Sequence, residues 1–299
     1  MNKFFRAIGF TSPMTAAGLQ SLVNEVLSAP DFRAYTTNGD DTLLAEFRMD
    51  FGEHCGVAVC GEFDANDQFR YEYCYPYCIS DTISTVQTIS VEPQIRQEGY
   101  LGVCDDFKVG VTLIFHVQDM VEYVKRYGAG NYTEEIRGVS VSLSSLSSEG
   151  VVMMPIQKSE SDIRQTKRNS VKRTRMIKDA MAGDEAAMES LTIEDMDTYA
   201  AISRQIQTED IYTLVDSYFM PFGVECDMYS VLGEIISVET TSNRVTGEEI
   251  VRMLVSCNDL KFSVCINQAD LYGEPAPGRR FKGVVWMQGM LHFQENLNL

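Results

Sequence analysis

Two groups of positively charged residues are the features of the sequence that most clearly indicate chemistry. One belongs to a basic run between residues 164 and 178, and the other accompanies the single tryptophan of the chain. Cations next to an aromatic ring hold single-stranded nucleic acid by phosphate contact and base stacking, and a basic run can also bind an acidic protein surface. The candidate binding residues are Arg168, Lys172, Arg173, Arg175, Arg279, Arg280, Lys282 and Trp286.

Each group also has a plainer interpretation. A basic run is suited to a solvated connector whose charges keep it soluble. A tryptophan in a strand is more often part of a core than of a binding surface, and Trp286 shares a face with Arg280 and Lys282 only if no bulge interrupts the strand. The sequence leaves both interpretations open.

No stretch of the chain carries a catalytic or cofactor signature. There is no G-x-G-x-x-G motif, no Walker loop and no H-E-x-x-H motif, so the usual dinucleotide, nucleotide and zinc-peptidase sites are not indicated. His54 and His116 occur without a nucleophile and an orienting acid at a recognisable spacing. We therefore expect no cofactor, and a binding protein in preference to an enzyme.

Acidic residues and cysteines permit a metal site but do not favour one. Carboxylates of the kind that bind magnesium or calcium are more often turn or surface residues when they flank strands; the candidates are Glu62, Asp64, Asp105 and Asp106. The eight cysteines lack the spacing of zinc knuckles. Since the chain shows no secretion signal, we expect reduced thiols that pack as small apolar groups.

The charge and composition describe a globular, acidic protein. The net charge of −18 repels a phosphate backbone at long range, which disfavours nucleic acid as a partner. No apolar run approaches the length that spans a bilayer, and the first ten residues lack the apolar core of a signal peptide. We expect a cytoplasmic protein without a membrane partner; its oligomeric state is not indicated.

The pattern of apolar residues divides the chain into three parts. Residues 1–157 alternate strands with two helices, one ending before Pro30 and one from Met120 to Gly128. They include a hairpin of residues 57–63 and 69–75 around a turn at residues 64–67. A second hairpin is expected from 139–143 and 151–156. This part is predicted to be an α+β domain with a largely antiparallel sheet.

The stretch from 158 to 221 reads as helix almost throughout. It begins with basic residues and turns acidic, and Gly183 with Asp184 is predicted to end one helix and begin the next. An apolar stripe from Ile211 to Phe219 predicts a last helix that ends at Pro221. We expect a charged helical connector between two folded parts.

Strands return in residues 222–299. Four strong candidates lie at 229–238, 250–257, 260–266 and 281–288, and a fifth at 290–294 follows a break at Gly289. Three strands, a short helix and two strands form the element order of an OB-type barrel, and Gly233 would allow the bend in its first strand. A small β-barrel, OB-like or of another antiparallel topology, is therefore predicted here. The expected fold class is α+β with this barrel after a central helical segment.

Four stretches also resemble a known family. KFFRAIGF (3–10), FGEHCGVAVCGEFD (51–64), residues 191–235 beginning LTIEDMDTYAAIS, and GRRFKGVVWMQG (278–289) are similar to Domain of Unknown Function 3881, an uncharacterised family of Gram-positive anaerobes. The resemblance covers nearly the whole chain. It implies an intracellular bacterial protein and assigns no functional residue.

The first functional hypothesis is a non-enzymatic binding or scaffold protein for a macromolecular partner, with a protein as the expected partner. It rests on the segment of residues 158–221, whose charge changes from basic to acidic, in a chain that lacks catalytic motifs. The alternative is a nucleic-acid-binding protein that uses an OB-like C-terminal barrel. A metal-dependent hydrolase centred on the N-terminal carboxylates is the third possibility.

Overall fold

The computed structural model describes residues 3–12, 15–37, 42–94, 99–106, 111–128, 133–156, 215–224 and 226–293, with residues 168, 172, 175–176, 179–180, 183–190 and 193 of the central stretch. Strands dominate this part of the chain, whereas its named α-helices are α1 (Ala16–Ser28) and α2 (Met120–Tyr127). Two short 3-10 helices, η1 (Lys3–Ile8) and η2 (Gln268–Asp270), are also present, and residues 185–190 of the central stretch are helical. None of these helices is long and apolar enough to cross a membrane.

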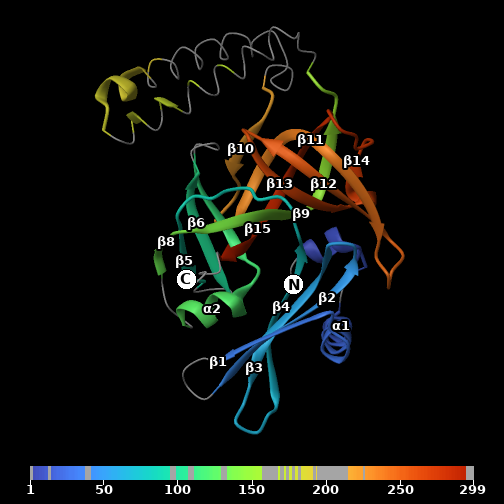
Figure 1. Cartoon of the computed structure of the whole chain (residues 1–299). Helices are drawn as coiled ribbons and strands as arrows, with labels where there is room; N and C mark the ends of the chain where they lie inside the picture. Colours follow the sequence, from blue (N-terminus) through green and yellow to red (C-terminus); the bar gives the residue numbers. More distant parts are fainter. Residues whose placement is uncertain are drawn as a thin grey trace.

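A four-stranded antiparallel sheet comes first along the chain, and projects from the rest of the molecule (Figure 1). Asp64 fixes the turn at its tip, because its carboxylate accepts hydrogen bonds from the backbone amides of Asn66 (2.8 Å) and Gln68 (3.0 Å). The predicted hairpin at this turn is confirmed. In order, the strands are β1 (Phe32–Thr37), β2 (Leu43–Gly52), β3 (Cys55–Phe63) and β4 (Phe69–Cys78).

Helix α1 covers one face of this sheet. Its buried residues Leu22, Val23 and Val26 lie on one face by helical spacing, and the helix contacts β2 and β3. Thr15 is the N-cap: its hydroxyl accepts a hydrogen bond from the backbone amide of Gly18 (3.1 Å).

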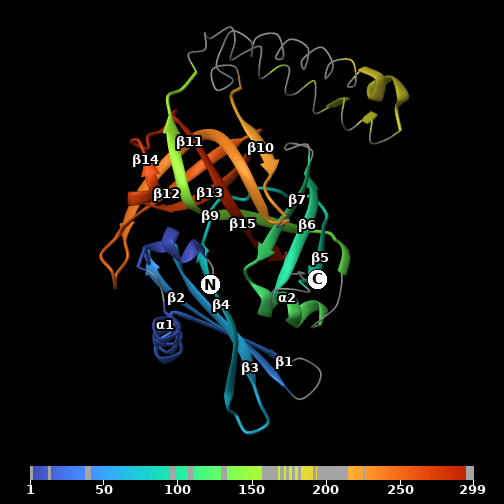
Figure 2. The same cartoon turned by 180° about the vertical axis from the view of Figure 1, so that it is seen from behind.

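The second sheet combines strands from the middle of the chain, residues 89–153, with strands from its C-terminal part, residues 218–293 (Figures 1 and 2). Strand β11 pairs with β12 and β15, β12 pairs with β13, and β9 pairs with β13 and β15, so these five pairings close into a ring. The strands are β5 (Ile89–Pro93), β6 (Tyr100–Asp106), β7 (Val111–Val117), β8 (Thr133–Ile136), β9 (Val139–Met153), β10 (Tyr218–Pro221), β11 (Met228–Ser242), β12 (Glu249–Cys257), β13 (Leu260–Asn267), β14 (Leu271–Tyr272) and β15 (Arg280–Phe293).

The predicted fold class is wrong, because the described residues are mostly strand and the C-terminal strands do not form a separate barrel. Residues 139–143 and 151–156 were expected to form a hairpin, yet residues 139–153 form one continuous strand, β9, which lies between β13 and β15. Strand β15 continues through Gly289, where a break was expected. The division at residues 157 and 222 stays a prediction, although the second sheet takes strands from both sides of it.

A central helical segment is likewise not supported. Tyr218 and Phe219 lie in strand β10, so the predicted last helix does not reach Pro221, and Ile211 lies outside the described residues. The predicted break at Gly183 is confirmed locally: Gly183 has a φ of 94°, and the Asp184 carboxylate accepts from backbone amides two and three residues later. This short piece, yellow in Figures 1 and 2, lies apart from both sheets.

A buried polar network joins the two sheets. Arg48 of β2 donates to a Glu46 carboxylate oxygen (2.7 Å) and to the Gln118 carbonyl oxygen (2.6 Å). The hydroxyl of Tyr75 in β4 donates to the same carbonyl oxygen (2.8 Å), while the Gln118 amide donates to the side-chain oxygen of Gln288 in β15 (2.8 Å). Because Gln118 directly follows β7 and Gln288 lies in β15, these bonds connect the projecting sheet to the second sheet.

The stability of this junction should depend on pH through His116. Its ring is buried against Tyr75 and Trp286, with ring centroids 4.6 and 5.4 Å away. Burial and the nearby charge of Arg48 lower the pKa of His116 to about 4. Between this value and the ordinary 6.5 the unfolded chain binds a proton that the folded chain does not, so stability is lost as the pH falls.

We expect this His116 contribution to lower the free energy of unfolding by about 2 kcal/mol between pH ~7 and pH ~5. Urea denaturation of the wild type and of His116→Phe at both pH values gives the pH dependence of each protein. The difference between the two dependences is the contribution of His116. The comparison with His116→Phe is needed because burial raises the pKa of Asp119 to about 7. Protonation of Asp119 in the folded protein increases stability as the pH falls, which opposes the effect of His116. Equal pH dependence in the two proteins would contradict the expectation.

Candidate functional site

Trp286, the aromatic candidate from the sequence, belongs to the core. Its side chain is 6% exposed, its ring stacks on Phe4 with centroids 5.6 Å apart, and its Nε1–H donates to an Asp227 carboxylate oxygen (2.7 Å). A nucleic-acid base has no access to the face of this ring.

The basic residues near Trp286 also do not form one binding surface. Arg280 is buried and donates to the carbonyl oxygens of Met154 and Val215, both at 3.0 Å. Arg279 donates to the carbonyl oxygen of Glu274 (2.6 Å), and Lys282 is half-buried on β15. Their contacts therefore lie within the protein and hold the start of β15.

The other basic candidates lie in the central stretch. Arg168, Lys172 and Arg175 are exposed, and the Arg175 guanidinium lies 3.9 Å from the Asp179 carboxylate. Arg173 lies outside the described residues. A binding role for this run stays a prediction.

The structure gives no support to a metal site in the described part of the chain. It contains no group of three His, Cys, Asp or Glu side chains that could hold a metal ion. Glu62 lies in β3, whereas Asp105 and Asp106 lie in β6 of the other sheet. The eight cysteines are free thiols, and all but Cys74 and Cys226 are buried.

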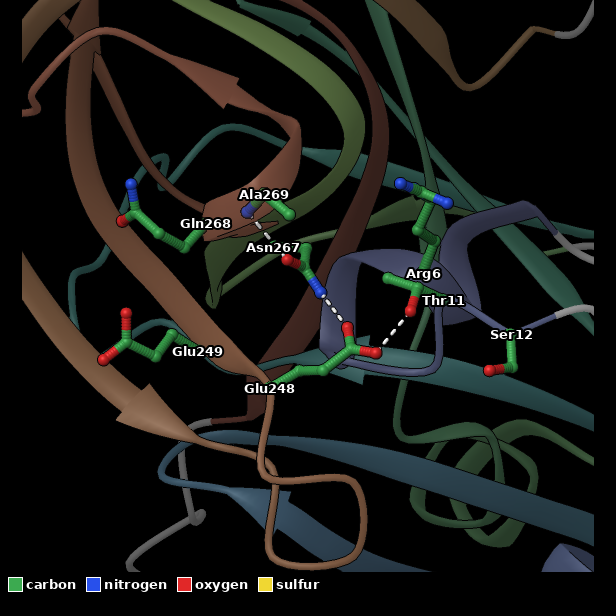
Figure 3. A pocket seen from close by; sticks show the side chains of 8 residues that line it. All are labelled: Arg6, Thr11, Ser12, Glu248, Glu249, Asn267, Gln268 and Ala269. Carbon is green, nitrogen blue, oxygen red and sulfur yellow. Dashed lines mark hydrogen bonds between the residues drawn. The ribbon is translucent and has the colours of Figure 1, made fainter.

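The structure instead brings polar residues together at a hollow of about 560 Å³ beside η1 (Figure 3). Helix η1 contacts β4, β9 and β13, so the hollow lies where the two sheets approach each other. The residues come from three distant segments of the chain. They are Arg6, Thr11, Ser12, Glu248, Glu249, Asn267, Gln268 and Ala269.

Glu248 is held at the centre of this hollow by neutral donors. The Asn267 side-chain amide donates to one carboxylate oxygen (2.5 Å), and the Thr11 hydroxyl donates to the other. Asn267 is itself buried at the end of β13, and its side-chain oxygen accepts from the Ala269 amide (2.8 Å) as the N-cap of η2. The carboxylate therefore has a fixed position in the wall of the hollow.

The segment that carries Thr11 is fixed by the turn after β11. The Asn243 side-chain amide donates to the Ile8 carbonyl oxygen, and the Thr246 hydroxyl donates to the Gly9 carbonyl oxygen, both at 2.7 Å. Gly9 has a φ of 89°, and a Cβ there would lie 2.7 Å from the Cβ of Asn243. Only glycine allows this close approach without strain.

The charges around the hollow do not balance. Arg6 forms a two-fold ion pair with Asp270, with N–O distances of 2.5 and 2.6 Å, and this hydrogen bonding raises the pKa of Arg6. The charge of Arg6 is thereby neutralised locally. Glu249 is exposed and makes no ion pair with another described residue. Two carboxylates, Glu248 and Glu249, consequently give the lining an excess of negative charge.

Several polar groups in the lining remain available to a ligand. The Gln268 amide, the Ser12 hydroxyl and the Glu249 carboxylate make no hydrogen bonds to the described residues. Sequence analysis missed this site because its residues lie more than 200 positions apart, from Arg6 to Glu248, and form no local motif. No spacing rule could have found them.

The fold and the hollow define a mainly β-stranded protein with a preorganised polar site on its surface. The chain belongs to the family described as "Domain of unknown function, E. rectale Gene description (DUF3881)", whose model matches residues 5–289. This confirms the family that the sequence resembles. No curated protein and no solved structure matches the chain.

Proposed function

We propose that this protein is a non-enzymatic binding protein that holds a small polar molecule in the hollow beside η1. The observation that carries the proposal is the convergence of fixed polar side chains from three distant segments on one hollow of about 560 Å³. This size is within the range of small-molecule sites, in which a few placed polar groups orient the ligand.

The lining favours binding over catalysis. It contains no His, Cys, Lys or Tyr, and both oxygens of Glu248 are engaged by Asn267 and Thr11. An activated nucleophile needs a base within hydrogen-bond reach that can take up its proton during the reaction. Glu248 acts here as a fixed acceptor that holds the wall together.

The same lining restricts the chemistry of the ligand. Amide, hydroxyl and carboxylate groups provide both donors and acceptors, which suits a molecule rich in hydroxyl groups. The carboxylates of Glu248 and Glu249 outnumber the cationic Arg6 in the lining and repel anions. The ligand class is therefore a neutral or positively charged sugar, polyol or amine.

A panel of small molecules tests this proposal by thermal shift and calorimetric titration. The panel contains glucose, glucosamine, a polyol, a polyamine and glucose 6-phosphate. At least one neutral or cationic member should bind and stabilise the folded protein, by about 2.7 kcal/mol at 100 times its Kd, whereas the phosphate should not. If only the anionic member binds, or none does, the proposal is wrong.

A matched pair of variants locates the binding in the hollow. Gln268→Ala should weaken binding about five- to thirtyfold, because removing a hydrogen-bonding side chain costs about 1–2 kcal/mol of binding free energy. Gln68→Ala, at the exposed tip of the β3–β4 hairpin, should leave the affinity unchanged. Equal effects of the two substitutions would place the ligand elsewhere.

A second candidate function is the capture of a protein partner by the basic run, which the exposure of Arg168, Lys172 and Arg175 favours. Reversing the charges at these residues and at Arg173 should abolish capture of the partner. The burial of Trp286 and Arg280 removes support from the nucleic-acid alternative.

A further inference from the structure

A second hollow of about 340 Å³ lies next to the first. It differs from the first because apolar side chains contribute to its wall, namely Phe10, Leu22 and Val245. Ser12 lines both hollows. The remaining lining is polar and comes from Thr15, Gly18, Ser21, Glu25 and Thr246.

One short backbone segment, residues 10–12, separates the two hollows. Phe10 lines the second hollow, Thr11 lines the first and Ser12 lines both. This short segment therefore contributes side chains to both hollows. A ligand that passes Ser12 can therefore contact both.

The apolar side of the second hollow is rigid. Phe10 packs edge-on against Phe51, with ring centroids 5.2 Å apart, and Leu22 lies on the buried face of α1. Val245 is 55% exposed, but its backbone amide donates to the Asn243 side-chain oxygen (2.9 Å). Because Val245 is held by its turn and exposed to solvent, an apolar group of a ligand placed over it would bury apolar surface and favour binding.

We propose that the two hollows hold one amphipathic ligand, with its polar head in the first hollow and a short apolar tail in the second. This inference rests on the proposed function, since it assigns the tail of the same ligand. The volume of the second hollow corresponds to roughly ten groups of the size of a water molecule, which limits the tail to a short alkyl chain. Glu25 at its wall disfavours a tail that ends in a carboxylate.

Calorimetric titration with alkyl glycosides tests the inference. The probes are glucose, glucosamine and their methyl, butyl, hexyl and octyl glycosides, each kept below its micelle concentration. The affinity should rise with chain length, by up to about fourfold for every added methylene, until the second hollow is filled. An affinity that is the same for all chain lengths overturns the tail site and leaves the proposed function intact.

Two valine variants assign the gain to the second hollow. Val245→Asp should remove the dependence on chain length without changing the affinity for the free sugar, because Val245 does not line the first hollow. Val86→Asp, at an exposed valine outside both hollows, should behave as the wild type. A chain-length effect that survives in Val245→Asp overturns the inference, and absence of binding by every probe overturns both the inference and the proposed function.

Discussion

An Arg48→Met variant should lose about 3–5 kcal/mol of unfolding free energy. The reason is the carboxylate of Glu46, which is 1% exposed and receives its charged hydrogen bond from Arg48. Its second oxygen, Oε2, has no hydrogen-bond partner among the described residues. Removing the guanidinium would leave a buried charge without a counter-charge, and would also remove one of the two hydrogen bonds to the carbonyl oxygen of Gln118.

Urea denaturation followed by the fluorescence of Trp286 measures this loss. Arg33→Met is the matched control, because Arg33 is exposed on the neighbouring strand β1 and should cost less than about 0.5 kcal/mol. The double variant Glu46→Leu with Arg48→Met should recover most of the stability, since both charges are then absent. A loss in Arg48→Met no larger than in Arg33→Met would show that the pair does not hold the junction.

A Gly56→Ala variant should be destabilised by more than about 3 kcal/mol, or should fail to accumulate as folded protein. A Cβ at Gly56 would lie 2.0 Å from the carbonyl oxygen of Met49 and 2.8 Å from the Cα of Asp50. Both atoms belong to the backbone of β2, which is paired with β3 on one side and β1 on the other. The strand cannot move away without breaking its hydrogen bonds.

Gly247→Ala provides the control for this prediction. Gly247 has a φ of 74°, and no heavy atom lies within 4 Å of a Cβ built there. Its substitution carries only the strain of a left-handed conformation, about 1–2 kcal/mol. Similar losses in the two variants would mean that the strand pair around Gly56 tolerates the methyl group.

Elements defined by local patterns were predicted well. Helix α2 begins at Met120 and ends before Gly128, as expected, and Gly128 has the positive φ that such an end requires. The hairpin around Asp64 and the helix that ends before Pro30 were also found. In each case a few neighbouring residues decide the conformation, through turn chemistry or through one apolar face.

The polar face of β2 shows a limit of predicting burial from local sequence patterns. Apolar and polar residues alternate along β2, a pattern that is typical of a half-buried strand, yet Glu46 and Arg48 on its polar face are buried too. A period of two identifies the residues that share a face, but not what packs against it. Here helix α2 contacts β2, and Gln118, which lies between β7 and α2, accepts a hydrogen bond from Arg48.

The sequence by itself determined the family, the turns, the two α-helices and most of the strands, because these depend on residues that are neighbours in the chain. Only the tertiary structure decided that β9 completes the C-terminal strands and that Arg6, Glu248 and Asn267 share one hollow. These arrangements join segments more than 100 residues apart. They depend on strand register and on the packing of whole elements, for which a single sequence contains no local signal.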